Sequence, residues 1–163
     1  MNTPKSHLRT FEGNAKAFHY AIIVSRFNDQ VTSKLLEGAR HCFQRHKVPQ
    51  NQIKIVQCPG AFELPQVANR LALLKKYDAI ICLGAVIRGE TPHFEYVCSE
   101  TARGVQNVAL QHNIPVVFGV LTTDTEAQAL DRVGGVHGHK GWDAALTAME
   151  MAELFRSLKK SAR

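Results

Sequence analysis

The sequence contains few cysteines, and their spacing excludes the common metal and disulfide motifs. Cys42, Cys58, Cys82 and Cys98 are 16 to 24 residues apart, with no Cys-x-x-Cys pair and no histidines at zinc-finger spacing. We therefore expect reduced thiols in the core and no metal site. No apolar run is long enough to span a membrane, and residues 1–7 lack the apolar core of a signal peptide. Both absences predict a cytoplasmic protein without a membrane partner.

Familiar motifs for phosphate binding, metal binding or nucleophilic catalysis are also missing. The sequence has no Walker loop, no Gly-x-Gly-x-x-Gly, no His-Glu-x-x-His and no nucleophile elbow. It therefore predicts none of the enzyme classes that these motifs define.

Positive charge is confined largely to the two ends of the chain. The formal net charge is +6. Residues 156–163 carry four basic side chains and no acid, and residues 1–16 carry three basic side chains and one acid, which leaves the remainder neutral. Nucleic-acid binding needs clustered cations on the folded surface. We therefore expect no nucleic-acid partner.

Length and composition indicate one globular domain. The chain has 163 residues, of which 45% are hydrophobic and 21% charged, so it can bury a core and is not a disordered chain. No repeat or low-complexity tract is visible. We expect one domain over residues 1–163, with a loose lead-in at residues 1–17 and a basic, frayed tail at residues 156–163.

Apolar patterns alternate between strand-like and helix-like periods along the chain. Strands are predicted at residues 20–24, 53–58, 77–83 and 116–121, after a short N-terminal candidate at residues 8–12. Helices are predicted at residues 31–46, 64–74, 91–112 and 142–160, with a short one around Arg132. Strict alternation predicts an α/β fold: a three-layer, doubly wound, flavodoxin-like sheet of four parallel strands with helices on both faces.

The segment Gly84–Tyr96 follows the predicted strand at residues 77–83 and combines features suited to chemistry. Its two glycines permit a tight turn, Thr91 can cap a helix, and Pro92 suits the first helical position. Free amides at a helix start attract anions, and the helix dipole there disfavours the charged form of His93. The segment predicts an anion site beside an acid/base group. The structural alternative is an ordinary strand-to-helix turn with a solvated histidine.

Other unusual residues also follow predicted strands, so they fall at the same edge of the sheet. Ligands of doubly wound sheets bind at this edge, beyond the carboxyl ends of the strands. Phe27 follows the first strand in a polar turn, where it either stacks on a flat ligand or covers the sheet edge. Phe62 follows the second strand and poses the same choice. Glu63, beside it, either accepts hydrogen bonds from ring or hydroxyl donors of a ligand or simply lies near a helix start. Arg132 and Lys140 are cations suited to a phosphate, or else solvated surface side chains.

Taken together, these segments resemble the 6,7-dimethyl-8-ribityllumazine synthase family. The resemblance covers roughly residues 18–155 in colinear order. Its segments are Ser25-Arg26-Phe27-Asn28, Pro59-Gly60-Ala61-Phe62-Glu63, Gly84 through His93, Phe118-Gly119-Val120-Leu121-Thr122-Thr123, and Arg132 with Lys140-Gly141. One such segment would be weak evidence, whereas five in the same order are specific.

The resemblance implies a transferase of riboflavin biosynthesis that uses no cofactor. Its substrates would be 5-amino-6-(D-ribitylamino)uracil and 3,4-dihydroxy-2-butanone 4-phosphate, joined with loss of phosphate and water. His93 would move the protons. The pyrimidine and ribityl groups would be held by Phe27, Asn28, Ala61, Phe62, Glu63, Ala85, Val86, Ile87, Phe118 and Lys140. The phosphate would be held by Glu90, Thr91 and Arg132.

The resemblance also implies partners. In this family the residues corresponding to Phe118, Arg132 and Lys140 come from a neighbouring subunit, so the site would lie between chains of a pentamer. The short connection from Arg132 to Lys140 is typical of members in which twelve pentamers form an icosahedral shell. Riboflavin synthase is a further candidate partner.

One departure from the family pattern is His139, flanked by His137, where members often carry asparagine before Lys140-Gly141. This change is either a neutral loop substitution or a source of pH sensitivity near the site or an interface. Two other functions stay open. A flavodoxin-like module that binds a flavin or nucleotide without catalysis would explain the sheet and the aromatic rim, and a homologue that only assembles into a shell would explain the fold.

Overall fold

Four strands form one parallel sheet in the order β2-β1-β3-β4 in the computed structural model, which describes residues 11–161. The strands are β1 (Tyr20–Ser25), β2 (Ile53–Cys58), β3 (Ala79–Ile87) and β4 (Val116–Thr123). β1 pairs with β2 and β3, and β3 pairs with β4, all in parallel. The carboxyl ends of all four strands therefore lie along one edge of the sheet.

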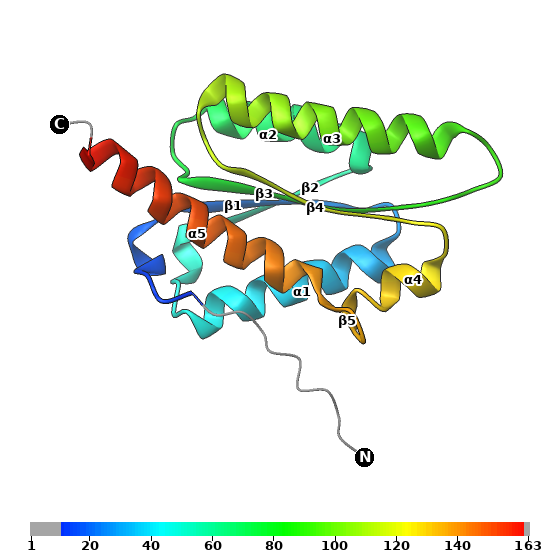
Figure 1. The fold of residues 1–163 in the computed structure, drawn as a ribbon, viewed down its shortest axis with the longest axis horizontal. Coiled ribbons are helices and arrows are strands. Elements are labelled where there is room, and N and C mark those ends of the chain that lie inside the picture. Colours follow the sequence, from blue (N-terminus) through cyan, green and yellow to red (C-terminus); the bar gives the residue numbers. More distant parts are fainter. Residues whose placement is uncertain (1–10, 162–163) are drawn as a thin grey trace, which may run out of the picture.

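Helices cover both faces of this sheet, as Figure 1 shows. The helices α2 (Leu64–Leu73) and α3 (His93–His112) lie on one face, and α1 (Asp29–Arg45) and α5 (Lys140–Ser161) on the other. The smaller elements are η1 (Ala15–Ala17), η2 (Gln50–Gln52), η3 (Ala61–Glu63), α4 (Glu126–Leu130), β5 (Val133–Gly135) and β6 (Gly138–His139). The predicted doubly wound α/β fold with four parallel strands is confirmed.

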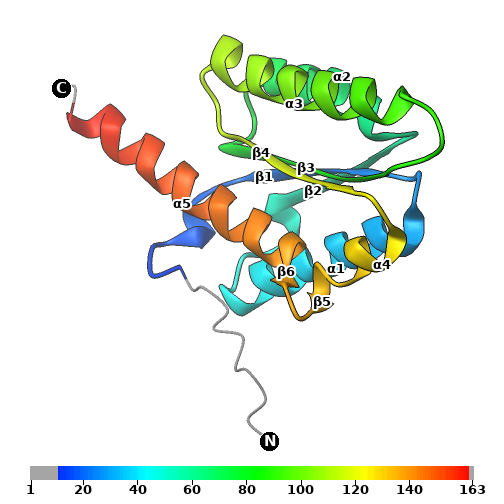
Figure 2. The same cartoon turned by 45° about the vertical axis from the view of Figure 1, so that its right-hand side comes forward.

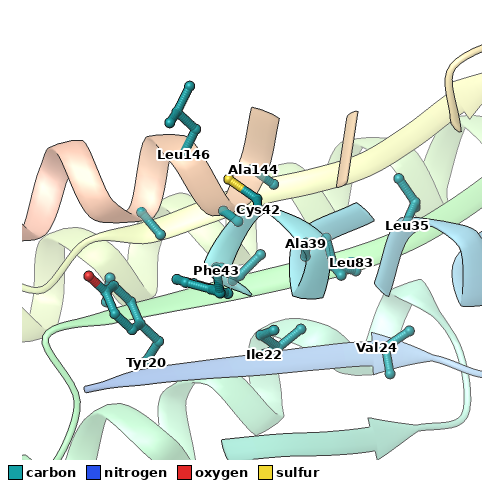
Figure 3. Packing of buried hydrophobic residues seen from close by; sticks show 14 of the residues in the cluster. Tyr20, Ile22, Val24, Leu35, Ala39, Cys42, Phe43, Leu83, Ala144 and Leu146 are labelled. Carbon is teal, nitrogen blue, oxygen red and sulfur yellow. The ribbon is translucent and has the colours of Figure 1, made fainter. Parts of the chain in front are cut away.

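The alternation of side chains along β1 divides the core into two parts. Tyr20, Ile22 and Val24 pack with α1 and α5, whereas Ala21 and Ile23 pack with α2 and α3. Figure 3 shows the first part, in which side chains of α1 and α5 meet those of β1 and β3. A strand buried on both faces favours apolar residues at successive positions, which explains the apolar run from Tyr20 to Val24.

The prediction that the third strand ends before Gly84 is wrong. β3 continues to Ile87, because residues 80–87 pair in register with residues 116–123 of β4. Gly84 therefore lies within the sheet and forms no turn. A Cβ there would lie 3.0 Å from Leu64 Cδ1 and 3.2 Å from Ser25 Oγ, so the glycine permits a close approach of α2 to the strand.

The connection between the fourth strand and the last helix also differs from the prediction. Arg132 follows α4 and is not part of it. The glycine-rich segment between Arg132 and Lys140, for which no strand was predicted, forms the antiparallel hairpin β5–β6. Gly134 and Gly138 have φ angles of 117° and 78° there, which favour glycine.

The chain ends are more ordered than predicted within the described part. The last helix, α5, extends through residue 161, so residues 156–161 are helical rather than frayed, and Figure 2 shows this end of α5 projecting past the sheet. Ala15 is buried within η1, inside the predicted loose lead-in. Of the predicted N-terminal strand at residues 8–12, residues 8–10 lie outside the described part, and residues 11 and 12 are not in a strand.

Candidate active site

A cavity of about 660 Å³ lies beyond the carboxyl ends of β1 and β3, beside η3 and the start of α3. Most of the predicted rim residues line it. The lining residues are Phe27, Asn28, Gly60, Ala61, Phe62, Glu63, Ala85, Val86, Ile87, Gly89, Thr91, His93, Phe94, Tyr96 and Val97. Three strand exits that are far apart in the sequence thus meet around one space.

The turn after β1 presents an aromatic side chain to this cavity. The backbone amide of Phe27 donates to the Pro59 carbonyl at 3.0 Å, so the turn is tied to the exit of β2. Asn28 adopts the left-handed conformation, with φ 58°, and its side-chain amide donates to the Ala85 carbonyl at 2.9 Å. Held in this way, the Phe27 ring stays 70% exposed. An exposed ring on a fixed backbone is suited to stacking on a flat ligand.

The exit of β2 contributes a second aromatic ring and a carboxylate. Gly60 is extended, and the chain then enters η3 at Ala61, which is buried, while Phe62 remains 49% exposed. A Cβ at Gly60 would come within 3.0 Å of Glu63 Oε2, so glycine leaves room for the carboxylate at the cavity wall. Glu63 can therefore accept hydrogen bonds from a ligand held between the two rings.

The start of α3 supplies backbone amides and an imidazole. The helix begins at His93 with Pro92 as its N-cap, and no side chain caps it, so the prediction that the Thr91 hydroxyl is the cap is wrong. Uncapped amides of the first turn can bind an anion, as expected for this segment. His93 is exposed on the cavity wall at the first helical position. Glu90 is exposed between the lining residues Gly89 and Thr91.

Arg88 directly follows β3, at the start of the connection to α3, and it was not predicted as a site residue. Its Nε donates to Asp124 Oδ1 at 2.8 Å and its Nη1 to Glu95 Oε1 at 2.6 Å. The guanidinium also lies 4.2 Å from the centre of the Phe94 ring. The hydrogen bonds to Asp124 and then to Glu95 raise the pKa of Arg88. Asp124 is 36 positions away, so no local sequence pattern indicates this network.

Tyr96 also lines the cavity and was not predicted as a site residue, although its spacing from His93 indicates this position. It lies three residues after His93 on α3, a spacing that puts two side chains on the same face of a helix. The cavity edge that holds the imidazole therefore also holds a phenol ring.

Phe118, Lys140 and Arg132 do not line this cavity. Phe118 lies on β4, one of the two edge strands, where it is 41% exposed. It shares a second groove of about 660 Å³ with Lys140 and Asp143. Lys140 Nζ lies 3.0 Å from Asp143 Oδ2. The Arg132 side chain donates to the Gln128 carbonyl at 2.8 Å, and its own carbonyl accepts from the Lys140 amide. Within one chain, these three residues therefore do not share the cavity that holds Phe27, Phe62 and His93.

The two histidines of the β5–β6 segment have different surroundings. His137 pairs with Asp131, and hydrogen bonds from His137 and from the Val136 amide lower the pKa of Asp131. His139 is half-buried against Gly38 of α1, where a Cβ would overlap its ring, and its Nδ1 is buried without a hydrogen-bond partner. Burial lowers the pKa of His139 below its ordinary value.

Residues 11–161 contain neither a candidate membrane span nor a candidate metal site. No helix in this part of the chain is long and apolar enough to cross a membrane. No three histidine, cysteine or acidic side chains in it are grouped so that they could hold a metal ion. All four cysteines are unpaired, and three of them are buried.

Known enzymes match this chain over most of its length. The family model of 6,7-dimethyl-8-ribityllumazine synthase matches residues 17–156. The 6,7-dimethyl-8-ribityllumazine synthase of Clostridium kluyveri is 50% identical over 154 residues, covering 93% of this chain and 100% of that protein, and a second strain gives the same figures. The match includes every residue of the cavity. The chain belongs to the 6,7-dimethyl-8-ribityllumazine synthase family.

Proposed function

We propose that this chain condenses 5-amino-6-(D-ribitylamino)uracil with 3,4-dihydroxy-2-butanone 4-phosphate in the cavity beyond β1 and β3. The product is 6,7-dimethyl-8-ribityllumazine, and phosphate and water are released. One observation carries the proposal: an exposed aromatic ring (Phe27), an uncapped helix start and an imidazole (His93) share one cavity in a member of this family. These are the groups needed for a flat ring, a phosphate and a proton transfer.

The pyrimidine stacks on Phe27 and lies against the wall formed by Ala85, Val86 and Ile87. The turn of Asn28 supports this arrangement, because its bond to the Ala85 carbonyl fixes the ring relative to β3. The ribityl chain extends along residues 61–63, where Glu63 accepts hydrogen bonds from its hydroxyls. An aromatic ring at Phe62 covers the same end of the cavity.

The phosphate of the ketone binds at Glu90 and Thr91 through their backbone amides, which lie just before the start of α3 at His93. The absence of a side-chain cap on this helix supports the assignment, since a capped terminus would compete with the anion. Arg132 of a neighbouring subunit supplies the charged clamp, with Phe118 and Lys140 of the same neighbour closing the ring site. Their separation from the cavity within one chain supports a site shared between subunits.

His93 moves protons as the amine attacks the ketone. Two partners held in the right geometry can lower the barrier by about 7–11 kcal/mol, and a positioned acid/base group adds about 10²- to 10⁴-fold in rate. Positioning therefore contributes more than the imidazole. The reaction should survive the loss of His93 at a reduced rate.

The assembly that follows is a homo-oligomer built on a pentamer. The short connection from Arg132 to Lys140 favours the icosahedral shell of twelve pentamers. Riboflavin synthase is the proposed partner that consumes the product. A reducing compartment such as the cytoplasm suits the four unpaired thiols.

The direct test is to mix the purified chain with both substrates and record lumazine fluorescence. Product formation is expected, and a chain that binds flavin without forming product would overturn the proposal.

The role of His93 is tested with His93→Ala, which should lower turnover at saturating substrate about 10²-fold or more without abolishing it. His19→Ala is the matched control, because His19 is exposed at the start of β1, at the opposite end of the sheet. Turnover of His93→Ala equal to that of the control would remove His93 from the mechanism.

The clamp is tested with Arg132→Ala, which should chiefly raise the KM for the phosphorylated ketone. Losing a charge-assisted contact of about 1.5–3 kcal/mol corresponds to roughly 10- to 100-fold. Arg103→Ala, which removes an exposed arginine on α3, is the control. An unchanged KM in Arg132→Ala would show that the clamp assignment is wrong.

A further inference from the structure

Arg88 connects three elements at the mouth of the cavity. Its backbone amide donates to the Thr123 carbonyl at 2.9 Å, which continues the pairing of β3 with β4. Its side chain bonds Asp124, just beyond β4, and Glu95, in the first turn of α3. Its guanidinium stacks on Phe94, the residue after His93. One side chain thus fixes the helix start relative to the edge of the sheet.

The ion pair between Arg88 and Glu95 closes a short loop. The two residues are seven positions apart, and the loop between them contains the phosphate-binding segment and His93. In residues 89–92 no side chain is buried, so packing does little to hold this backbone in place. The side-chain contacts of Arg88 therefore restrain the loop, in addition to the bond from the Glu95 amide to the Pro92 carbonyl.

We propose that Arg88 is a positioning residue, which holds the phosphate loop and His93 in place for the condensation. This inference rests on the proposed function of the cavity. Arg88 acts through Glu95, Asp124 and Phe94, because its bonded donors are directed at the two carboxylates. A guanidinium suits this task better than an ammonium, since its planar fork can bond two carboxylates and stack on a ring at once.

Arg88 also has an electrostatic effect on the anion site. Without the guanidinium, the carboxylates of Glu95 and Asp124 would stand unpaired beside the segment that binds phosphate. Negative charge there disfavours a second anion, although exposure to water weakens the effect. Loss of Arg88 should therefore weaken the binding of the phosphorylated substrate more than the binding of the uncharged pyrimidine.

The experiment compares Arg88→Met, Arg88→Lys and the control Arg103→Met in steady-state assays of lumazine formation. Arg103 lies on α3, the helix to which Arg88 is bonded through Glu95, and its side chain is exposed with a 3.7 Å contact to Glu100. Its loss therefore removes an exposed arginine nearby without touching the bonds of Arg88. For Arg88→Met we expect the KM for the ketone phosphate to rise and kcat to fall, each by about 10-fold. A misplacement of about 1 Å can cost up to 100-fold. The KM for the pyrimidine should stay within about twofold of the wild-type value.

Arg88→Lys should be intermediate, because one ammonium cannot replace both bonds and the stacking contact. The milder variants Glu95→Gln and Asp124→Asn should each reproduce part of the effect, and they keep the test valid if Arg88→Met folds poorly. The dissociation constant for inorganic phosphate, measured by calorimetry, should rise in Arg88→Met together with the KM for the ketone phosphate.

Kinetic constants of Arg88→Met equal to those of Arg103→Met would overturn the inference. So would an equal rise in both KM values together with a lowered melting temperature in every Arg88, Glu95 and Asp124 variant, because that pattern indicates a structural role only. A wild-type chain without synthase activity would refute the proposed function instead. In that case the phosphate titration still tests whether Arg88 shapes the anion site.

Discussion

Replacing Gly141 with alanine should separate two helices that the fold requires to be in contact. Gly141 is buried at the start of α5, where a Cβ would lie 2.0 Å from the Leu35 carbonyl oxygen of α1. Ordinary contact begins at 3.4 Å, so the helices must separate by about 1.4 Å at this point. The obstacle is backbone, and rotation of a side chain cannot relieve the overlap.

The magnitude follows from two opposing effects. Alanine favours a helix over glycine by up to about 1 kcal/mol, whereas overpacking of a filled core costs about 1–3 kcal/mol and occasionally more. A backbone obstacle should bring the overpacking cost to the upper end or beyond. The separation would also loosen the packing of Leu146 and Met149, which belong to the core on this face of the sheet. We expect a net loss of about 2–3 kcal/mol.

Thermal unfolding at fixed protein concentration measures this loss. For a chain of this length, about 2–3 kcal/mol corresponds to a fall of roughly 4–12 °C in Tm. Gly89→Ala is the matched control for stability, because a Cβ at Gly89 meets nothing within 4 Å. If Gly141→Ala melts within about 1 °C of Gly89→Ala, the close approach of α1 and α5 at Leu35 is refuted.

Two further substitutions test half-buried His139 of the β5–β6 hairpin and the Asn28 turn at the cavity. Burial lowers the pKa of His139 below its ordinary 6.5, so the unfolded chain takes up a proton before the folded chain does. Stability therefore falls as the pH drops from about 6.5 through the folded-state pKa. His139→Asn should show a smaller difference between its urea midpoints at pH 7.5 and pH 5 than the wild-type chain. Asn28→Ala loses the bond to the Ala85 carbonyl and leaves alanine at a positive φ. The KM for the pyrimidine should then rise about fivefold, which corresponds to one neutral hydrogen bond of about 1 kcal/mol. Phe27→Ala, measured in parallel, gives the effect of losing the whole ring.

The sequence predicts the fold well because its signals are local and strong. β1 is an unbroken apolar run, and the inward stripe of α3, from Phe94 through Val108, has the helical period. The strand exits follow from topology, since parallel strands end at one edge. Of the residues that line the cavity, sequence position alone predicts Phe27, Phe62, Glu63 and His93. The family resemblance adds Asn28, Ala61, Ala85, Val86, Ile87 and Thr91.

The remaining features depend on contacts between distant segments. Gly84 resembles a turn residue in the sequence, but pairing with β4 and the approach of Leu64 make it part of a strand. The β5–β6 hairpin is too short to produce an alternating pattern. Arg88 has one partner nearby in the sequence and one beyond β4, so only the folded chain reveals its network.

The charges around the cavity support a site completed by a second subunit. Among the lining residues in the described part of the chain there is a carboxylate, Glu63, but no lysine or arginine. Arg88, at its mouth, is already paired with two carboxylates. A phosphate monoester carries close to two negative charges at neutral pH, and helix amides contribute only about half a positive charge. The proposed clamp, Arg132 of a neighbouring subunit, would supply the missing charge, since Arg132 does not line its own chain's cavity.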